Sequence, residues 1–489
     1  MSASDRSGGS RARRFGLLGH PLGHSLSPAL HGFFLDQLGV EGTYELFDTP
    51  PERLGEAVER LRAELDGFNC TIPHKKAVMP YLDAVDEAAA RYGAVNTVRC
   101  GADGRLEGYN SDGPGFRAAL AAAGLALGRG RALVVGAGGV ARMLAMEAAL
   151  AGDEVWVAAR SQAKAADLCA DVERALGGRS SVRSRGVGLD ELPGIVASGV
   201  RFPLLLQATP VGMWPDTAGL PVPVGVLDGV DAVFDTIYNP LSTRLVLAAR
   251  RRGLPAAGGL GMLVEQAAVS FRLWNPDLPD PLPGSGEGRR ELDRRLRTAL
   301  LVRSPFNLVL TGFMGSGKST VGKVLARALD ADFTDLDTLV EERTGQTVPE
   351  LFANLGEPEF RRLEQEALRT LDAPTKLRIV ATGGGALLTP ESVRRVHEGR
   401  GVVVLLDASI HAILKRVGNG DGRPLLSGPG AEERARELMQ KRRPAYLAAA
   451  DAVVMAGRPA KQVALSVQVA LGLEDLPDRP DRSDQGGTT

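Results

Sequence analysis

One loop constrains the fold of this 489-residue chain more than any other feature. An apolar run, Asn307–Thr311, leads into Gly-Phe-Met-Gly-Ser-Gly-Lys-Ser at 312–319, which matches the pattern G-x-x-x-x-G-K-[ST]. Such a loop turns backbone N–H groups toward phosphate oxygens, places a lysine ammonium beside them and offers a hydroxyl to Mg²⁺. A glycine-rich turn without a ligand is the alternative, but the strand-like run before it argues against that reading. Because this loop follows the first strand of its domain, we expect a nucleotide-binding domain that begins near Ser304.

Length and composition set limits on the rest of the chain. At 489 residues it exceeds one hydrophobic core and suggests roughly three domains. A hydrophobic content of 44% with 24% charged residues is typical of a soluble globular protein. No apolar run is long enough to predict a membrane span, and a formal net charge of -1 gives no reason to expect nucleic acid. Three widely spaced cysteines without a C-x-x-C pair argue against disulfides and zinc and favour the cytoplasm.

The two ends of the chain have polar compositions. Residues 1–13 are rich in Ser, Gly and Arg, lack a following apolar stretch that would suggest a secretory signal, and are predicted to be a disordered arm. Residues 474–489 are predicted to be a disordered tail. We infer no obligatory protein partner from the sequence.

Polar residues gather on two turns near the N-terminus. Phe15–Gly19 predicts a strand, and Ser27 before Pro28 predicts a helix N-cap followed by a proline in the first turn. Capping explains Ser27 but not Ser25, and a helix N-terminus flanked by two hydroxyls can also seat a carboxylate. Lys75 follows another strand-like run; its ammonium could transfer a proton or be a solvated surface charge, and the sequence alone favours neither.

These turns are part of a longer set of motifs. With them, Gly93–Thr97, Gly108–Gly115, Asp235–Thr243 and Gly259–Ala267 resemble the shikimate dehydrogenase family. The resemblance implies that Lys75 and Asp112 form the catalytic pair, because hydride delivered to a ring ketone creates alkoxide character on an oxygen that a cation must protonate. The residues that it implies for binding 3-dehydroshikimate and shikimate are Ser25, Ser27, Asn69, Thr71, Asn96, Tyr238 and Gln266.

A second glycine loop lies between the strand-like Arg131–Val135 and a helical run. Its sequence, Gly-Ala-Gly-Gly-Val-Ala at 136–141, is the G-x-G-x-x-A fingerprint of dinucleotide-binding folds. Arg160 stands where an NAD enzyme would carry an acid, so this turn suits a 2'-phosphate and predicts NADP(H), with a solvated arginine as the alternative. The residues expected to bind this cofactor are Gly136, Ala137, Gly138, Gly139, Val140, Ala141, Arg160, Ser161, Lys164, Thr209 and Gly259.

The dehydrogenase resemblance implies two α/β domains with the active site in the cleft between them. Residues 14–114 and 241–275 would form the substrate domain, and a Rossmann-type NADP-binding domain, 115–240, would be inserted between them. Residues 276–303 contain prolines and glycines followed by a charged, helix-prone run, and we interpret them as a flexible linker. A flexible tether predicts that shikimate leaves the first site into solvent before it reaches the second.

The segment after the linker carries two carboxylates and several further motifs. Asp335 and Asp337 end a strand-like run and are expected on one face of it, because side chains alternate along a strand. With the motifs Gly356–Glu364, Gly383–Gly385, Arg423–Leu426 and Lys441–Pro444, they resemble shikimate kinase over residues 304–473. This resemblance implies a P-loop, NMP-kinase-like α/β/α domain.

The kinase resemblance assigns roles to individual residues. It implies that Asp337 contacts the attacked hydroxyl, and that Ser319 and Asp335 support Mg²⁺. Lys318 and Arg423 would carry phosphate charge, because phosphoryl transfer depends mainly on positioning and electrostatic stabilisation. The residues implied for shikimate are Asp337, Arg361, Gly384 and Arg442, and those for ATP are Gly315, Ser316, Gly317, Lys318, Ser319, Thr320, Arg416 and Arg423. The glycine-rich segment 418–430 is interpreted as a lid.

The two resemblances together predict a bifunctional enzyme. It would reduce 3-dehydroshikimate to shikimate with NADPH and then phosphorylate the 3-hydroxyl of shikimate with ATP. A non-catalytic sensor built from the same domains is one alternative, but the intact residues Lys75, Asp112, Lys318 and Asp337 argue against it. A quinate-directed dehydrogenase that prefers NAD is the other.

Overall fold

The computed structural model describes residues 12–23, 25–177, 183–282, 287–417 and 430–474. The expected arm, tail and lid therefore lie almost entirely outside the described residues. The chain divides into two compact units, residues 1–303 and 304–489. Across the described ranges, none of the helices combines the length and the apolar character needed to cross a membrane.

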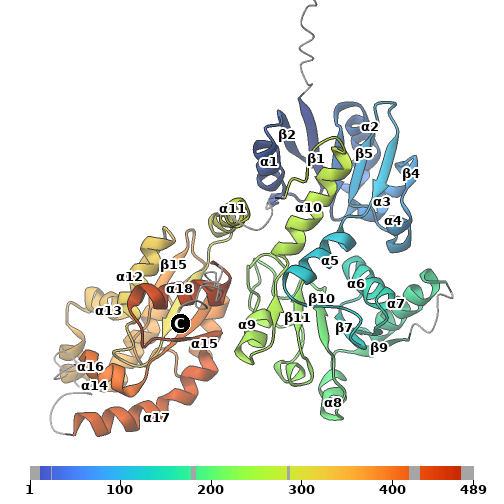
Figure 1. Ribbon diagram of the computed structural model, residues 1–489. Coiled ribbons are helices and arrows are strands. Elements are labelled where there is room, and N and C mark those ends of the chain that lie inside the picture. Colours follow the sequence, from blue (N-terminus) through green and yellow to red (C-terminus); the bar gives the residue numbers. More distant parts are fainter. Residues whose placement is uncertain (1–11, 24, 178–182, 283–286, 418–429, 475–489) are drawn as a thin grey trace, which may run out of the picture. The chain divides into compact units, whose positions relative to one another are not determined.

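The first sheet of the first unit is mixed (Figure 1). Its strand order is β2-β1-β3-β5-β6-β4, with β1 parallel to both of its neighbours and β5 antiparallel to both of its own. The strands are β1 (Arg13–Gly19), β2 (Gly42–Asp48), β3 (Gly67–Cys70), β4 (Ala84–Val85), β5 (Thr97–Cys100) and β6 (Leu106–Tyr109). Its helices are α1 (Ser27–Leu38), α2 (Leu54–Glu64), α3 (His74–Ala77) and α4 (Glu87–Tyr92). Phe15 and Leu18 point to opposite faces and enter separate buried clusters, so both faces of this sheet are covered.

The second sheet is parallel throughout, in the order β12-β11-β10-β7-β8-β9. Its strands are β7 (Arg131–Val135), β8 (Glu154–Ala159), β9 (Ser184–Gly188), β10 (Leu204–Gln207), β11 (Val233–Asp235) and β12 (Ala256–Ala257). Its helices are α5 (Asp112–Ala122), α6 (Gly139–Leu150), α7 (Gln162–Ala175), α8 (Leu192–Ala197) and α9 (Arg244–Arg251). Val134 and Val135 lie in different buried clusters, which is why β7 is an unbroken apolar run.

The boundary expected at residue 240 between the inserted domain and the substrate domain is wrong. After Asp235 the chain continues in α9, whose Leu245 and Ala249 lie in a core of the second sheet, and β12 then adds a strand to that sheet. The chain first returns to the first sheet with α10 (Leu260–Trp274), the yellow-green helix in Figure 1. A two-residue strand is too short to leave a pattern in the sequence.

The interpretation of residues 276–303 as a flexible linker also needs correction. Their second half forms α11 (Glu287–Arg303), in which Leu292, Leu296 and Leu300 are buried. Leu292 and Leu296 share a cluster with aromatic side chains of α1 and α10. Leucines four residues apart lie on one helical face, so the charged residues around them conceal an amphipathic helix that belongs to the first unit.

The second unit is built on a five-stranded parallel sheet in the order β14-β15-β13-β16-β17. The strands are β13 (Asn307–Thr311), β14 (Asp332–Asp335), β15 (Arg378–Ala381), β16 (Gly401–Asp407) and β17 (Ala452–Met455). The helices are α12 (Lys318–Ala328), α13 (Leu336–Thr344), α14 (Val348–Leu368), α15 (Pro390–Glu398), α16 (Ile410–Val417), α17 (Ala431–Ala449) and α18 (Ala460–Leu471). The glycine loop joins the central strand β13 to α12, as its sequence predicts.

Candidate active sites

A cavity of about 1340 Å³ lies in the first unit. Residues from both of its sheets line it, because the loops after β1 and β3 face the start of α6 across it. The expected site residues that line it are Ser25, Ser27, Asn69, Thr71, Lys75, Asn96, Asp112, Ala137, Gly138, Gly139, Val140, Lys164, Tyr238, Gly259 and Gln266.

The expected catalytic pair is in direct contact. The Lys75 Nζ atom lies 2.5 Å from Asp112 Oδ2, although the two residues are 37 positions apart. The other carboxylate oxygen of Asp112 accepts a hydrogen bond of 2.8 Å from the Asn96 amide. The lysine side chain keeps 27% of its surface exposed and the aspartate side chain 14%. The carboxylate is thus held in place and in turn holds an ammonium that faces the cavity.

A buried polar network supports this wall of the cavity. The Asn69 amide donates to Ser270 Oγ at 2.9 Å and accepts from the Tyr44 hydroxyl at 2.9 Å. Ser270 also bonds Thr97 at 2.7 Å. All of these polar groups are paired with one another, so the network fixes the orientation of the amide that we expect to face the substrate.

The expectation that Ser27 caps a helix with its side chain is wrong. Helix α1 begins at Ser27 itself, and the preceding Leu26 makes no side-chain cap. The backbone N–H of Ser27 instead donates to the Ser25 hydroxyl at 3.2 Å. The roles are therefore exchanged, since Ser25 satisfies an unpaired N–H at the helix start while Ser27 lies in the first turn.

The dinucleotide fingerprint occupies the turn from β7 to α6. Gly136 has a φ of 120°, which disfavours any side chain there, and a Cβ added at Gly138 or Gly139 would meet no atom within 4 Å. The backbone at the start of α6 is thus open to a pyrophosphate, and this fits a dinucleotide. Ala141 is fully buried in the core beneath, so its part in the fingerprint is helix packing.

Besides Ala141, four of the expected cofactor residues are not in the cavity wall: Gly136, Arg160, Ser161 and Thr209. Ser161 caps α7 by accepting from the Lys164 N–H at 3.4 Å, which brings Lys164 to the wall. Thr209 accepts from the buried Gln207 amide at 2.9 Å. Arg160 is exposed on the turn after β8, and its contact with a 2'-phosphate stays a prediction.

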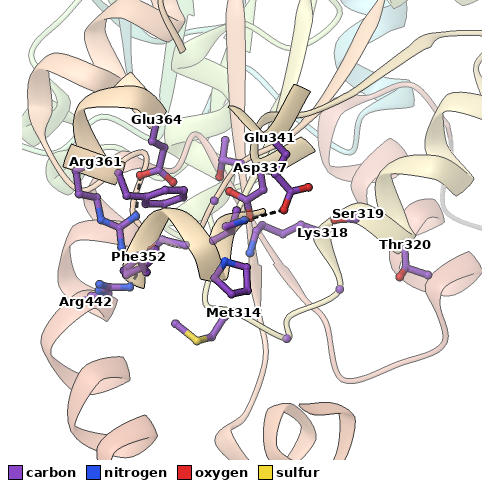
Figure 2. Close-up of a pocket in the computed structure, with 18 of the residues that line it drawn as sticks. Met314, Lys318, Ser319, Thr320, Asp337, Glu341, Phe352, Arg361, Glu364 and Arg442 are labelled. Atoms are coloured by element: carbon purple, nitrogen blue, oxygen red, sulfur yellow. Dashed lines mark hydrogen bonds and ion pairs between the residues drawn. The ribbon is translucent and has the colours of Figure 1, made fainter. Parts of the chain in front are cut away.

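The second unit has its own cavity, of about 590 Å³, around the phosphate loop (Figure 2). The expected residues that line it are Gly315, Gly317, Lys318, Ser319, Thr320, Asp337, Arg361, Gly384, Arg416 and Arg442. Ser316 is buried in the loop, and its hydroxyl is without a partner among the described residues. Arg423 lies outside the described residues.

Asp335 and Asp337 do not share a strand face as expected. Strand β14 ends at Asp335, which caps α13 by accepting from the backbone N–H of Asp337 at 3.1 Å. Its other oxygen accepts from the Ser319 hydroxyl at 2.6 Å. A hydroxyl and a carboxylate this close are oxygen donors of the kind that Mg²⁺ takes, so they fit the expected metal.

Asp337 lies in the first turn of α13 and points into the cavity (Figure 2). Burial raises the pKa of its carboxyl, while the nearby positive charge of Lys318 acts against that rise. Lys318 itself donates to the carbonyls of Gly312 and Phe313 at 2.9 and 3.2 Å. The lysine therefore lies between the glycine loop and the aspartate.

An arginine cluster closes the far side of this cavity. Arg361 bonds the fully buried Glu364 at 2.7 Å, and the two side chains point toward one another in Figure 2. A Cβ at Gly385 would overlap the Arg361 guanidinium, and one at Gly383 would overlap the Glu364 carboxylate. The glycines are thus required for the ion pair to approach the loop. Arg442 donates to the Gly384 carbonyl at 3.4 Å.

Comparison with known proteins identifies the first unit. The family model "Shikimate dehydrogenase substrate binding domain" matches residues 17–98, and "Shikimate 5'-dehydrogenase C-terminal domain" matches residues 259–280. A protein of Thermus thermophilus named shikimate dehydrogenase (NADP(+)) is 43% identical over 279 residues, which are 57% of this chain and 98% of the relative. The chain belongs to the shikimate dehydrogenase family.

Further comparisons extend this result. A shikimate dehydrogenase (NADP(+)) from Symbiobacterium thermophilum is 42% identical, over 54% of this chain and 88% of the relative. The crystal structure of a Thermus thermophilus shikimate 5-dehydrogenase in complex with NADP(H) and shikimate has a TM-score of 0.50 and 40% identity, and covers 58% of this chain and 99% of that one. Outside that region, the shikimate kinase family model matches residues 314–471.

The predicted fusion is thereby confirmed. A shikimate dehydrogenase with a Rossmann-type second sheet is followed in one chain by a P-loop shikimate kinase domain. The chain is a bifunctional enzyme of the shikimate pathway, with an oxidoreductase and a kinase activity.

Several residues that line the kinase cavity or support the dehydrogenase site have no role predicted from the sequence, although some of them lie in the motifs named above. Glu364 and Ser270 could have been found from helical spacing, because they follow Arg361 and Gln266 by three and four positions. Tyr44 could not have been found from the sequence. It lies on β2 and contacts Asn69 on β3, and these strands come together only through β1 in the folded sheet. The missed residues are Tyr44, Thr97, Ser111, Arg142, Asp171 and Ser270 in the dehydrogenase, and Met314, Glu341, Phe352, Phe360, Glu364 and Thr382 in the kinase.

Proposed function

We propose that the dehydrogenase reduces 3-dehydroshikimate to shikimate with NADPH, and that the kinase transfers phosphate from ATP to the 3-hydroxyl of shikimate with Mg²⁺. When bound, NADPH supplies the hydride and ATP the phosphoryl group. The observation that carries the first half is the 2.5 Å contact between Lys75 and Asp112 in the cavity that also receives the open glycine loop. We place both reactions in the cytoplasm, which suits the three free cysteines.

In the reduction, the Lys75 ammonium donates a proton to the ketone oxygen as hydride reaches the carbonyl carbon. Asp112 holds that ammonium and balances its charge, and Asn96 orients the carboxylate. Ser25 and Ser27 bind the substrate carboxylate. Asn69, Thr71, Tyr238 and Gln266 complete the substrate contacts.

In the kinase reaction, Asp337 accepts the proton of the attacking hydroxyl. Its raised pKa makes it a stronger base than an ordinary carboxylate while Lys318 keeps its ionised form accessible. Lys318 and Arg423 stabilise charge on the transferred phosphate, and Arg361 and Arg442 bind the shikimate carboxylate. Ser319 and Asp335 would hold the metal. Arg416, which donates to the Ser316 carbonyl at 3.2 Å, would stack on the adenine.

The full chain tests both halves in one assay. NADPH oxidation is followed after addition of 3-dehydroshikimate, and products are separated with and without ATP and Mg²⁺. We expect shikimate without ATP and shikimate 3-phosphate with it. Binding of 3-dehydroshikimate without NADPH oxidation would indicate a sensor, and faster turnover of quinate with NAD⁺ would indicate the other alternative.

A further inference from the structure

Helix α11 is fastened to the dehydrogenase along its whole length. Near its start Arg289 pairs with Glu265 of α10 at 3.1 Å, and in its middle the Arg295 guanidinium lies 5.4 Å from the centre of the Phe33 ring of α1. Leu292, Leu296 and Leu300 are buried between these contacts. The last residue of the helix is therefore held in a defined place by packing rather than by its own side chain.

That last residue, Arg303, reaches the substrate side of the dehydrogenase. Its Nη1 atom donates to the backbone carbonyl of Ser25 at 2.5 Å. Ser25 and Tyr238 both line the cavity. Burial raises the pKa of the Tyr238 hydroxyl and the charge of Arg303 acts against that rise, which shows that the guanidinium lies close enough to influence the cavity wall.

The Arg303 bond completes the restraint of one serine. The Ser25 N–H donates to the Leu22 carbonyl at 3.2 Å, and its hydroxyl accepts from the Ser27 N–H at 3.2 Å. With the carbonyl bonded to Arg303, the backbone N–H and the backbone carbonyl of Ser25 are both paired. Because the hydroxyl oxygen is oriented by the Ser27 N–H, its own proton remains to be donated to a ligand in the cavity.

We propose that Arg303 is a positioning residue of the dehydrogenase, which holds the Ser25–Ser27 segment in the orientation that binds the substrate carboxylate. This inference rests on the proposed function, because it deepens the role of the same site. It also means that the residue immediately before the kinase unit, which begins at Ser304, contributes to the affinity of the dehydrogenase for its substrate.

The test compares variants of the full chain. Arg303→Met keeps a long side chain and helix propensity but removes the donor and the charge, whereas Arg303→Lys keeps both. Arg294→Met is the matched control, because Arg294 lies on the same helix and pairs with Glu291 there. Steady-state kinetics are measured for 3-dehydroshikimate, NADPH, shikimate and ATP. Thermal unfolding is recorded for each variant.

We expect Arg303→Met to raise the KM for 3-dehydroshikimate by roughly 3- to 10-fold, as for one hydrogen bond. The dehydrogenase kcat, the KM for NADPH and the kinase parameters should stay within about 2-fold of wild type. Arg303→Lys should recover most of the loss, and Arg294→Met should behave as wild type. In the reverse reaction, Arg303→Met should raise the KM for shikimate. It should not raise the KM for shikimate methyl ester, which carries no carboxylate.

An unchanged KM for 3-dehydroshikimate in Arg303→Met would overturn the inference while leaving the proposed function intact. An equal rise in KM for shikimate and its methyl ester, or for 3-dehydroshikimate and NADPH, would show a general structural effect. Either result would also overturn the inference. A wild-type chain that fails to oxidise NADPH with 3-dehydroshikimate would instead reject the proposed function.

Discussion

The two active sites of this chain hold their charged groups in opposite ways. In the dehydrogenase the proposed proton donor and its carboxylate are already paired, with Lys75 and Asp112 in contact and the Asn96 amide bonded to the carboxylate. In the kinase the proposed base, Asp337, lies close to further negative charge, since Asp335 and Glu341 add to the effect of burial in raising its pKa. Arg361 is paired, but with the buried Glu364 beside the base.

The difference follows from what each reaction brings to its site. A ketone carries no charge to the reacting oxygen, so the dehydrogenase must supply both the proton and the counter-charge itself. A phosphoryl donor brings several negative charges and a metal, so a kinase site needs cations and oxygen ligands arranged in advance around them. One ion pair therefore suffices in the dehydrogenase, whereas the kinase site depends on a balance among many positive and negative groups.

The largest expected effect separates the two sites. Lys75→Ala should lower the dehydrogenase kcat by about 10²- to 10⁴-fold, as for loss of a general acid, and leave kinase turnover near wild type. Lys318→Ala should lower kinase turnover by about 10²-fold or more and leave the dehydrogenase unchanged. Each activity is the control for the other in the same preparation. Loss of both activities in either variant, with an unchanged circular dichroism spectrum, would refute two independent sites.

A smaller effect tests the cofactor of the dehydrogenase. Arg160→Asp should raise the KM for NADPH by about 10- to 100-fold, as for loss of a charge-assisted hydrogen bond, and shift the preference toward NADH. Arg129→Asp, a charge reversal at another exposed arginine of the same domain, is the control. If the KM values for NADPH and NADH are the same in Arg160→Asp as in wild type, Arg160 does not contact the cofactor.

The pH dependence of the kinase tests the balance of charges around Asp337. Because its pKa is raised, kcat/KM should fall as the pH drops through a value above that of an ordinary carboxyl, where the base becomes protonated. Glu341→Gln removes a negative charge that raises this pKa but keeps an acceptor for the Val348 N–H. The acid limb should then move to lower pH, by less than about one unit.

Glu342→Gln is the control for that experiment, because the neighbouring side chain is exposed and outside the cavity wall. An acid limb that moves equally in both variants would indicate a general change in surface charge. A limb that does not move at all in Glu341→Gln would show that another group controls the pH profile.

The smallest expected effect concerns transfer between the sites. Each cavity is lined by residues of one unit alone, so shikimate should leave the first before it enters the second. In an assay started from 3-dehydroshikimate, NADPH and ATP, added labelled shikimate should appear in the 3-phosphate in proportion to the free pool. Product that stays unlabelled beside abundant labelled shikimate would demonstrate a channel.

Local patterns in the sequence were sufficient where one short segment forms a site by itself. The loop between β13 and α12 and the turn between β7 and α6 are of this kind, because neighbouring residues supply both the backbone geometry and the proposed ligand contacts. The pairing of Lys75 with Asp112 instead required a family resemblance, since the two lie 37 residues apart and meet only through folding.

The errors have physical causes. A serine before a proline suits an N-cap, but α1 begins one residue earlier than that, at Ser27, and the hydroxyl of Ser25 accepts the bond from its N–H. Asp337 lies in α13 and not in the strand, because Asp335 ends the strand and its side chain caps the helix by accepting from the Asp337 N–H. The helical run itself was expected, but the packing of α11 was missed because its arginines outnumber the three leucines that are buried. With α11 packed on the first unit, there is no long flexible tether before β13, since only residues 304–306 connect the two elements. The expectation of a free shikimate pool therefore rests on the separate cavities alone.

The packing of α11 also fixes an order of events during synthesis. The cluster that covers one face of the first sheet combines Phe15, made among the first residues, with Trp274 and Leu296, made after the whole second sheet. Chains fold as they emerge, and a domain is completed only when its last packing element is available. The second sheet can therefore close while the first sheet still exposes an aromatic face. A ribosome that stalls between residues 260 and 300 would release a chain with one finished domain and one open apolar surface, the kind of species that chaperones bind.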